Sequence, residues 1–193
     1  MRNLLLMVQT ACDELGIPRL SAVAGSADAQ AQQLFALANR AGQALADREG
    51  PVGCWPELRK EWLQTIGGSV DNYAAPDDLR FFLNTTAWDR TNDWPLQGPI
   101  SPEVWQVLKS GTIGSTGPRT RFRRMAGRIY FDPSPATNQD VVIEYCTSKW
   151  CTDSTASTSR ERFTSDSDLP LILDDAFILE LKWRYRRAKG LDY

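Results

Sequence analysis

The sequence predicts an α+β fold: a mainly helical bundle scaffold, formed by N- and C-terminal helices, with an antiparallel β-sheet or hairpin region inserted between them. Apolar residues recur at helical spacing near both ends of the chain, within residues 4–49 and 168–189. Between these ends, short segments rich in aromatic and β-branched residues alternate with Gly and Pro turns, as strands do. We therefore expect a helical part over residues 1–60, a β-rich insertion with one short helix over residues 61–162, and a C-terminal helix over residues 163–193 that completes the bundle.

The first two helices are predicted from apolar stripes and from the residues that end them. The first helix ends at a Gly-x-Pro turn over residues 16–18. Its stripe consists of Leu4 or Leu5, Val8, Cys12 and Leu15. The second helix begins at Ser26 or Asp28, since either side chain can accept a hydrogen bond from the first turn, and it ends at the Gly-Pro pair of residues 50–51. Its stripe consists of Leu34, Ala38, Ala41 and Leu45. A short helix is expected over residues 55–60.

The middle of the chain is predicted to contain one hairpin, four further strands and one helix. The hairpin joins residues 62–66 to residues 69–73 through a Gly-Gly turn. The helix begins at Ser101, because a serine followed by a proline and an acidic residue is typical of a helix start. The further strands are expected over residues 81–87, 120–125, 128–131 and 140–147.

The predicted C-terminal helix, residues 168–189, is apolar on more than one side. We expect Asp168 to cap its first turn and Gly190 to end it. One apolar face consists of Ile172, Ala176, Leu179 and Trp183, and another consists of Leu173, Phe177 and Leu181. Because several sides of such a helix must be covered, one side is expected to pack within the subunit and another to meet a second protein. The alternative is a central core helix of a monomer.

The composition disfavours several classes of function. The 193 residues include no His, the commonest general base, and the net charge of −2 gives no bulk attraction to nucleic acid. The four cysteines lack the two close pairs of a zinc site, and the Gly-rich residues 111–117 lack the Lys of a phosphate loop. No metal-ligand spacing links the acidic residues Asp89, Asp93, Asp132, Asp140 and Glu144. We therefore predict no enzyme activity, no catalytic residue, no cofactor and no metal. No membrane contact is expected either, because the C-terminal apolar run is too short to span a bilayer.

Three blocks of the sequence resemble one known family. They are TACDELGIP at residues 10–18, the central WDR, WPLQGPISP and WQ followed by a lysine within residues 88–109, and KWRY with KGLDY within residues 182–193. In their order and spacing these blocks resemble the head-to-tail adaptor, or connector, proteins of tailed bacteriophages, of the podovirus-type portal adaptor family. The resemblance extends over nearly the whole chain.

The resemblance implies a structural virion protein that is located in the neck between head and tail and is made in the cytoplasm of the bacterial host. Such adaptors form a ring, typically twelve-fold, under the portal, where they extend the DNA channel and provide the platform for tail attachment. The implied partners are the portal protein, neighbouring copies of the chain, and downstream tail or nozzle proteins, with genomic DNA passing transiently. Another neck or tail-tube component of the same virion is an alternative.

Two groups of residues are candidates for partner binding. The first lies at the basic end of the C-terminal helix and would contact the portal or a neighbouring subunit; it consists of Trp183, Arg184, Tyr185, Arg186, Arg187 and Lys189. The second is a basic hairpin with Arg119, Arg121, Arg123, Arg124 and Arg128. This hairpin is interpreted either as a solvated face or as a contact for an acidic partner. A rival function is a sequence-independent DNA-binding module in which this hairpin is the DNA-binding surface.

Overall fold

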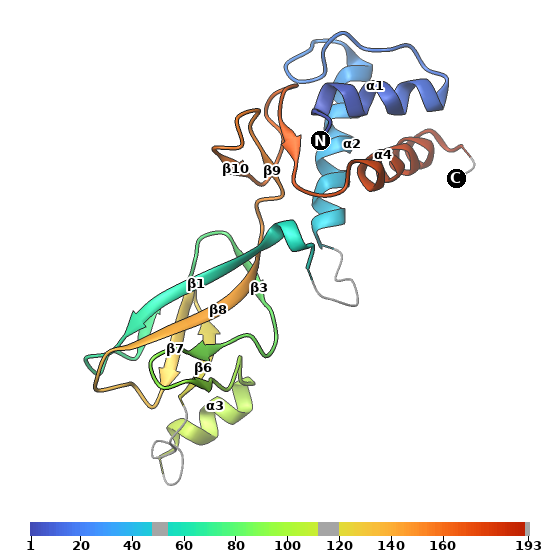
Figure 1. Ribbon diagram of the computed structural model, residues 1–193. Coiled ribbons are helices and arrows are strands. Elements are labelled where there is room, and N and C mark those ends of the chain that lie inside the picture. Colours follow the sequence, from blue (N-terminus) through green and yellow to red (C-terminus); the bar gives the residue numbers. More distant parts are fainter. Residues whose placement is uncertain (48–53, 112–119, 192–193) are drawn as a thin grey trace. The chain divides into compact units, whose positions relative to one another are not determined.

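The computed structural model describes residues 1–47, 54–111 and 120–191. Within these residues it has four α-helices and three antiparallel sheets (Figure 1). The chain divides into two compact units: Met1–Leu58 with Ser148–Tyr193, which we call the helical unit, and Arg59–Thr147, which we call the β unit. None of the helices described is long and apolar enough to cross a lipid bilayer.

The helical unit contains three α-helices, one 3-10 turn and a small three-stranded sheet. The helices are α1 (Leu4–Leu15), α2 (Ala29–Asp47) and α4 (Asp174–Lys189), and the turn is η1 (Pro56–Leu58). The sheet has the order β10-β9-β11, with β9 at Cys151–Thr152, β10 at Ser159–Arg160 and β11 at Leu169–Pro170. The predicted end of the second helix at residues 50–51 lies outside the described residues.

The ends of α1 and α2 are formed by local hydrogen bonds. The side chain of Asn3 accepts a hydrogen bond from the backbone of Leu6, and Gly16 ends α1 in the left-handed conformation, with a φ of 68°. Of the two residues predicted to cap α2, Asp28 accepts a hydrogen bond from the backbone N–H of Ala31 at 2.8 Å. These helix starts and stops therefore follow from short-range sequence signals.

The core of the helical unit includes aromatic residues that do not belong to its helices. Phe163 packs edge-to-face on Trp150, with ring centroids 4.8 Å apart, and on Phe177 of α4 at 5.6 Å. All three rings are buried. The helices α1 and α2 both pack against α4 around this cluster.

The prediction of a mainly helical bundle scaffold is therefore wrong, although the structure is α+β. Most of the described residues lie in strands and loops. The helices do not close a core by themselves, because Trp150 and Phe163 reach it from the non-helical segment that carries β9, β10 and β11.

The β unit consists of two antiparallel sheets and one helix. The larger sheet has the order β1-β8-β4-β5, with β3 also paired to β8; its strands are β1 (Arg59–Ile66), β3 (Leu79–Phe82), β4 (Trp88–Asp89), β5 (Trp94–Pro95) and β8 (Gln139–Thr147). The smaller sheet has the order β2-β7-β6, with β2 (Asn72–Ala74), β6 (Arg121–Met125) and β7 (Arg128–Asp132). The helix α3 (Pro102–Lys109) begins at Ser101, as predicted, because the serine hydroxyl accepts a hydrogen bond from Val104.

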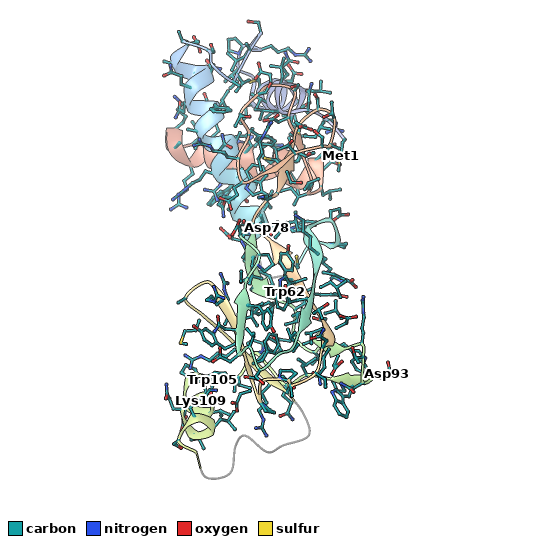
Figure 2. All side chains as sticks on the ribbon, turned by 90° about the vertical axis from the view of Figure 1, so that its left-hand side faces the viewer. Met1, Trp62, Asp78, Asp93, Trp105 and Lys109 are labelled. Carbon is teal, nitrogen blue, oxygen red and sulfur yellow. The ribbon has the colours of Figure 1, made fainter. Side chains whose placement is uncertain are left out.

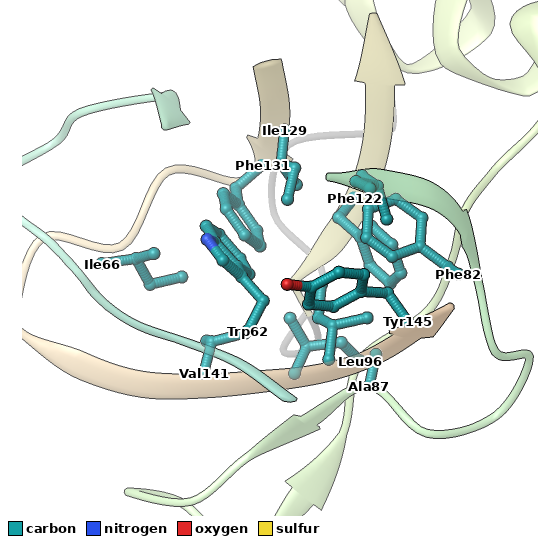
Figure 3. Packing of buried hydrophobic residues seen from close by; sticks show 12 residues of the cluster. Trp62, Ile66, Phe82, Ala87, Leu96, Phe122, Ile129, Phe131, Val141 and Tyr145 are labelled. Atoms are coloured by element: carbon teal, nitrogen blue, oxygen red, sulfur yellow. The ribbon is translucent and has the colours of Figure 1, made fainter. Parts of the chain in front are cut away.

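The two sheets enclose an aromatic core (Figure 3). Trp62 of β1 stacks on Phe131 of β7, with ring centroids 6.4 Å apart. Phe122 of β6 lies 6.4 Å from Phe131 and meets Phe82 of β3 edge-to-face at 5.6 Å. These contacts join strands from both sheets, so the burial of aromatic surface holds the β unit together.

The strands differ from the prediction in several places. The strand expected over residues 81–87 ends at Phe82 as β3, and the helix expected over residues 55–60 is the turn η1 followed by the start of β1. The predicted hairpin closed by Gly67 and Gly68 is wrong, because β1 pairs with β8 over its whole length and β2 pairs with β7. The hairpin of β6 and β7 is confirmed, and Ala126 and Gly127 turn the chain with φ angles of 50° and 72°.

Candidate partner-binding surfaces

The helix α4 begins later than the sequence indicates, because Asp168 is used elsewhere. Its buried carboxylate accepts hydrogen bonds from the backbone N–H groups of Thr164 at 2.6 Å and Ser165 at 2.9 Å. It also accepts one from the Arg160 guanidinium at 3.0 Å. The carboxylate therefore folds residues 164–168 into a tight loop, and the prediction of Asp168 as the helix cap is wrong. The helix starts at Asp174, with Leu173 as its N-cap.

The inner face of α4 supplies the core of the helical unit. Phe177 and Leu181, which belong to one predicted apolar face, are fully buried, and Ile178 and Tyr185 are nearly so. Leu173, predicted on the same face, is 59% exposed at the helix start. This face therefore packs within the subunit, as the sequence pattern indicates.

A second apolar stripe of α4 lies at the surface of the helical unit. Leu179 is 61% exposed, and Ala176 and Trp183 are partly exposed. Together with Leu45 of α2 and the stem of Glu180, these three residues line a shallow surface depression. We call Ala176, Leu179 and Trp183 the α4 patch. It contains the predicted face except for Ile172, which is buried.

Cationic side chains lie along one edge of the α4 patch, beside Trp183. The guanidinium carbons of Arg184 and Arg187 lie 5.5 Å and 5.2 Å from the centroid of the Trp183 ring, within the range of cation–π attraction. Arg184 also forms an ion pair with Glu180 at 2.8 Å. Arg186 and Arg187 are exposed and make no ion pair with any residue that the structure describes. The patch is therefore an apolar surface with a basic edge.

Tyr185 and Lys189, the remaining predicted residues at the basic end of α4, are close together but differ in exposure. The Lys189 ammonium lies 5.5 Å from the centroid of the Tyr185 ring. Lys189 is exposed, whereas Tyr185 is buried to 7% exposure in the inner face of α4. Tyr185 therefore contacts Lys189 from the buried side of α4, and its own ring is too buried to contact a partner.

The arginines of the predicted basic hairpin lie along β6 and β7, except for Arg119, which lies outside the described residues. Arg124 donates to the backbone carbonyl of Arg80 at 3.1 Å, and Arg121 donates to the side chain of Gln97 at 3.3 Å. Arg128 donates to the side-chain oxygen of Asn72. Arg123 is partly exposed, and it follows Phe122, which points into the core. Three of the described arginines thus bind acceptors of their own unit.

A further surface, which the sequence did not reveal, crosses the outer face of the larger sheet. Leu63 of β1 lies opposite Val142 of β8, Val142 lies opposite Trp88 of β4, and Trp88 lies opposite Pro95 of β5. Directly opposed residues share one face of a sheet, so these four form a continuous row. Leu63 is 60% exposed and Trp88 is 40% exposed. We call Leu63, Trp88 and Pro95 the sheet patch, with Val142 as its buried floor.

The buried carboxylate of Asp78 in the β unit is held by hydrogen bonds from its neighbours (Figure 2). Burial alone would raise the pKa of the Asp78 carboxyl, but hydrogen bonds from Lys60, Thr147 and Tyr145 outweigh it and lower the pKa to about 2. The three donors lie 2.7, 2.8 and 2.9 Å from its oxygens. These hydrogen bonds satisfy the buried charge of the Asp78 carboxylate.

Two buried thiols of the helical unit are also poorly suited to chemistry. Cys12 and Cys151 are free and buried. Burial raises the pKa of the Cys151 thiol to about 12, and the nearby Asp168 carboxylate adds to this effect. Among the residues that the structure describes, no cluster of His, Cys, Asp or Glu side chains could hold a metal ion.

Comparison with known proteins gives one informative match. A family model described as SU10 adaptor protein matches residues 3–193, which is almost the entire chain. No curated protein matches the sequence. The family match supports the resemblance to phage head-to-tail adaptors, while the podovirus type stays a prediction. The chain belongs to the SU10 adaptor family, a family of bacteriophage adaptor proteins.

Proposed function

We propose that this chain joins the head of a tailed bacteriophage to its tail, as a podovirus-type adaptor in the neck of the virion. Copies of the chain form a ring under the portal, with twelve as the expected number, and the ring extends the DNA channel and carries the tail proteins. The observation that supports this function is the family match over residues 3–193. The chain acts as a structural component without catalytic activity.

The exposed surfaces are suited to such a role. A ring contact joins two different patches of the same protein, so each subunit needs one patch for each neighbour, besides a surface for the portal. The helical unit has an apolar patch with a basic edge at Trp183, Arg184 and Arg187, and the β unit has an apolar row across its sheet. We propose that the basic end of α4, including Arg186 and Lys189, contacts the portal or a neighbouring subunit.

The rival function, a DNA-binding module that uses the arginine hairpin, has less support. Arg121, Arg124 and Arg128 donate to acceptors of their own unit, so binding to phosphates would have to compete with these hydrogen bonds. The net charge of −2 also gives the chain as a whole no attraction to DNA. We propose that DNA passes through the ring without being held by this hairpin.

Mixing the purified chain with the portal protein of the same phage would test this function. Electron microscopy of the mixture is expected to show a ring of copies attached to the portal, whereas the chain without portal gives no such particle. A mobility-shift assay on double-stranded DNA, repeated at several salt concentrations, serves as the second measurement, because phosphate contacts make binding steeply salt-dependent. Absence of portal binding, together with tight and salt-dependent DNA binding, would favour the rival function.

A further inference from the structure

The two apolar patches of the chain differ in the charges around them. The sheet patch lies beside two acidic residues, Glu61 of β1 and Glu144 of β8, which are directly opposed across the strands. Glu61 forms an ion pair with Arg90 at 3.1 Å. Glu144 is partly exposed and has no ion-pair partner in the part of the chain that the structure describes. Like charges that face each other in a sheet are unfavourable. A cation bound beside Glu61 and Glu144 would therefore reduce the repulsion between their carboxylates.

The α4 patch provides the complementary set of groups. Its apolar residues, Leu179 and Trp183, are accompanied by the exposed guanidinium groups of Arg186 and Arg187. Trp and Arg are the residue types that contribute most to binding at protein interfaces. Each patch therefore combines exposed apolar side chains, one of them a tryptophan, with an excess of one charge. At the α4 patch Arg184, Arg186 and Arg187 outnumber Glu180, and at the sheet patch Glu61 and Glu144 outnumber Arg90.

We infer that the α4 patch of one copy docks on the sheet patch of the next copy, with Arg186 and Arg187 facing Glu144 and Glu61. This inference rests on the proposed function, since it names the contact that would build the proposed ring. A basic patch that meets an acidic patch gives a head-to-tail contact, which is the kind that a ring requires. In a two-fold dimer through either patch alone, the charge in excess would have the same sign on both sides.

A second copy of the chain is favoured over other occupants by this matching of the two patches. The β1 strand is an edge of its sheet, so the row that begins at Leu63 is open to a neighbour along that edge. A portal or tail segment would need to match only one patch, and the charge of the other patch would then be unexplained. If a portal or tail segment covers a patch instead, the charge-reversal experiment described next will show no rescue between copies.

Charge reversal on each side tests the contact. The variants are Arg187→Glu on α4, Glu144→Arg on β8 and the double variant, each prepared as the full chain with its portal. Assembly is measured as the chain concentration at which half of the portals carry a complete ring. Each single reversal is expected to raise this concentration at least about tenfold, because like charges brought together at an interface suppress association. The double variant restores opposite charges and is expected to return to within about threefold of the parent.

Mixing the two single variants distinguishes a contact between copies from one within a chain. In an equimolar mixture, Arg187→Glu copies can alternate with Glu144→Arg copies, and every contact then joins opposite charges. We expect the mixture to assemble nearly as well as the double variant. Rescue in the double variant without rescue in the mixture would place the interaction within one chain and overturn the inference. Lack of rescue in both would also overturn it.

Controls keep this result separate from the proposed function and from misfolding. Arg40→Glu on α2 and Glu103→Arg on α3 reverse exposed charges outside both patches and are expected to leave assembly unchanged. Leu179→Ser and Trp88→Ser test the apolar parts of the patches, with thermal melting as the check on folding. If the parent chain forms no ring with its portal, the proposed function fails. If it forms rings and both single reversals assemble like the parent, only the inferred contact fails.

Discussion

The indole ring of Trp150 lies directly against the backbone of Gly42 in α2. A methyl group added at residue 42 would lie 2.2 Å from two ring carbons of Trp150, far inside van der Waals contact. Trp150 is fully buried and also packs on Phe163. The absence of a side chain at Gly42 therefore allows a large ring from a distant part of the sequence to enter the core of the helical unit.

Gly42→Ala is expected to lower the free energy of unfolding by about 1–3 kcal/mol, the usual cost of overpacking a core. A Gly to Ala change inside an ordinary helix would instead stabilise it by about 1 kcal/mol, so the sign of the effect is informative. Urea denaturation followed by circular dichroism measures it. In a Trp150→Phe background the smaller ring leaves room, and the same change should cost less. A stabilising effect of Gly42→Ala in the parent would contradict the packing described here.

This contact shows which parts of the structure short-range sequence patterns can predict. The helix α3 was predictable because Ser101 and Pro102 determine its start locally. The hairpin of β6 and β7 was predictable because two residues that accept positive φ angles separate two strand-like segments. By contrast, no periodicity indicates that Trp150 enters the core beside Gly42, since the two residues are far apart in sequence.

The two candidate surfaces also differ in whether short-range sequence patterns predict them. The two stripes of α4 follow from helical spacing, and the outward position of Leu179 agrees with that pattern. The sheet patch depends on the registers of β1, β8 and β4, which bring Leu63 and Trp88 onto one row. Because β1 pairs with β8 instead of forming the hairpin expected at Gly67 and Gly68, this row could not be obtained from the sequence.

Replacing Asp168 tests the loop that precedes α4. Asp168→Asn removes the charge that binds Arg160 and turns one carboxylate oxygen into an NH2 group, which faces either the Arg160 guanidinium or the N–H groups of Thr164 and Ser165. Leaving such buried groups unpaired costs about 1–3 kcal/mol each, so we expect a loss of at least about 2 kcal/mol in unfolding free energy. Asp175→Asn, at an exposed carboxylate of the first turn of α4, is the control and should cost less than about 1 kcal/mol. Equal effects of the two changes would mean that the buried hydrogen bonds of Asp168 contribute no more to stability than an exposed carboxylate does.

The Asp78 carboxylate predicts how stability depends on pH. Its pKa is lowered from an ordinary value of 3.8 to about 2 in the folded protein. A lowered folded-state pKa stabilises the protein above the unfolded-state pKa, and this contribution is lost as the pH falls through the folded-state value. The β unit should therefore lose about 2 kcal/mol of stability between about pH 4 and about pH 2 from this group. Asp78→Asn should be less stable at neutral pH and should show a smaller further loss in the acid range. The measurement is a set of urea titrations at fixed pH values, and an unchanged acid dependence in the variant would contradict this role.

The two faces of α4 predict opposite effects of similar truncations. Phe177 is fully buried against Phe163, so Phe177→Ala should lower the unfolding free energy by about 3–5 kcal/mol, the range for removing an aromatic ring from a core. Leu179 is 61% exposed, so Leu179→Ala should change stability by less than about 0.5 kcal/mol. Trp183→Ala should be intermediate, because its ring is only partly covered and part of that cover comes from Arg184 and Arg187.

For ring assembly, the order of the two variants should be reversed, with Leu179→Ala having a larger effect than Phe177→Ala. Leu179→Ala removes apolar surface only from the outer face of α4, so it is expected to weaken ring formation on the portal while the melting temperature stays that of the parent. Phe177→Ala should lower the melting temperature strongly, and at temperatures where it remains folded it should still assemble, because its ring does not reach the surface. Melting curves and portal assembly, measured on both variants, separate the two faces. If Leu179→Ala melts and assembles like the parent, the outer face of α4 is only a solvated surface.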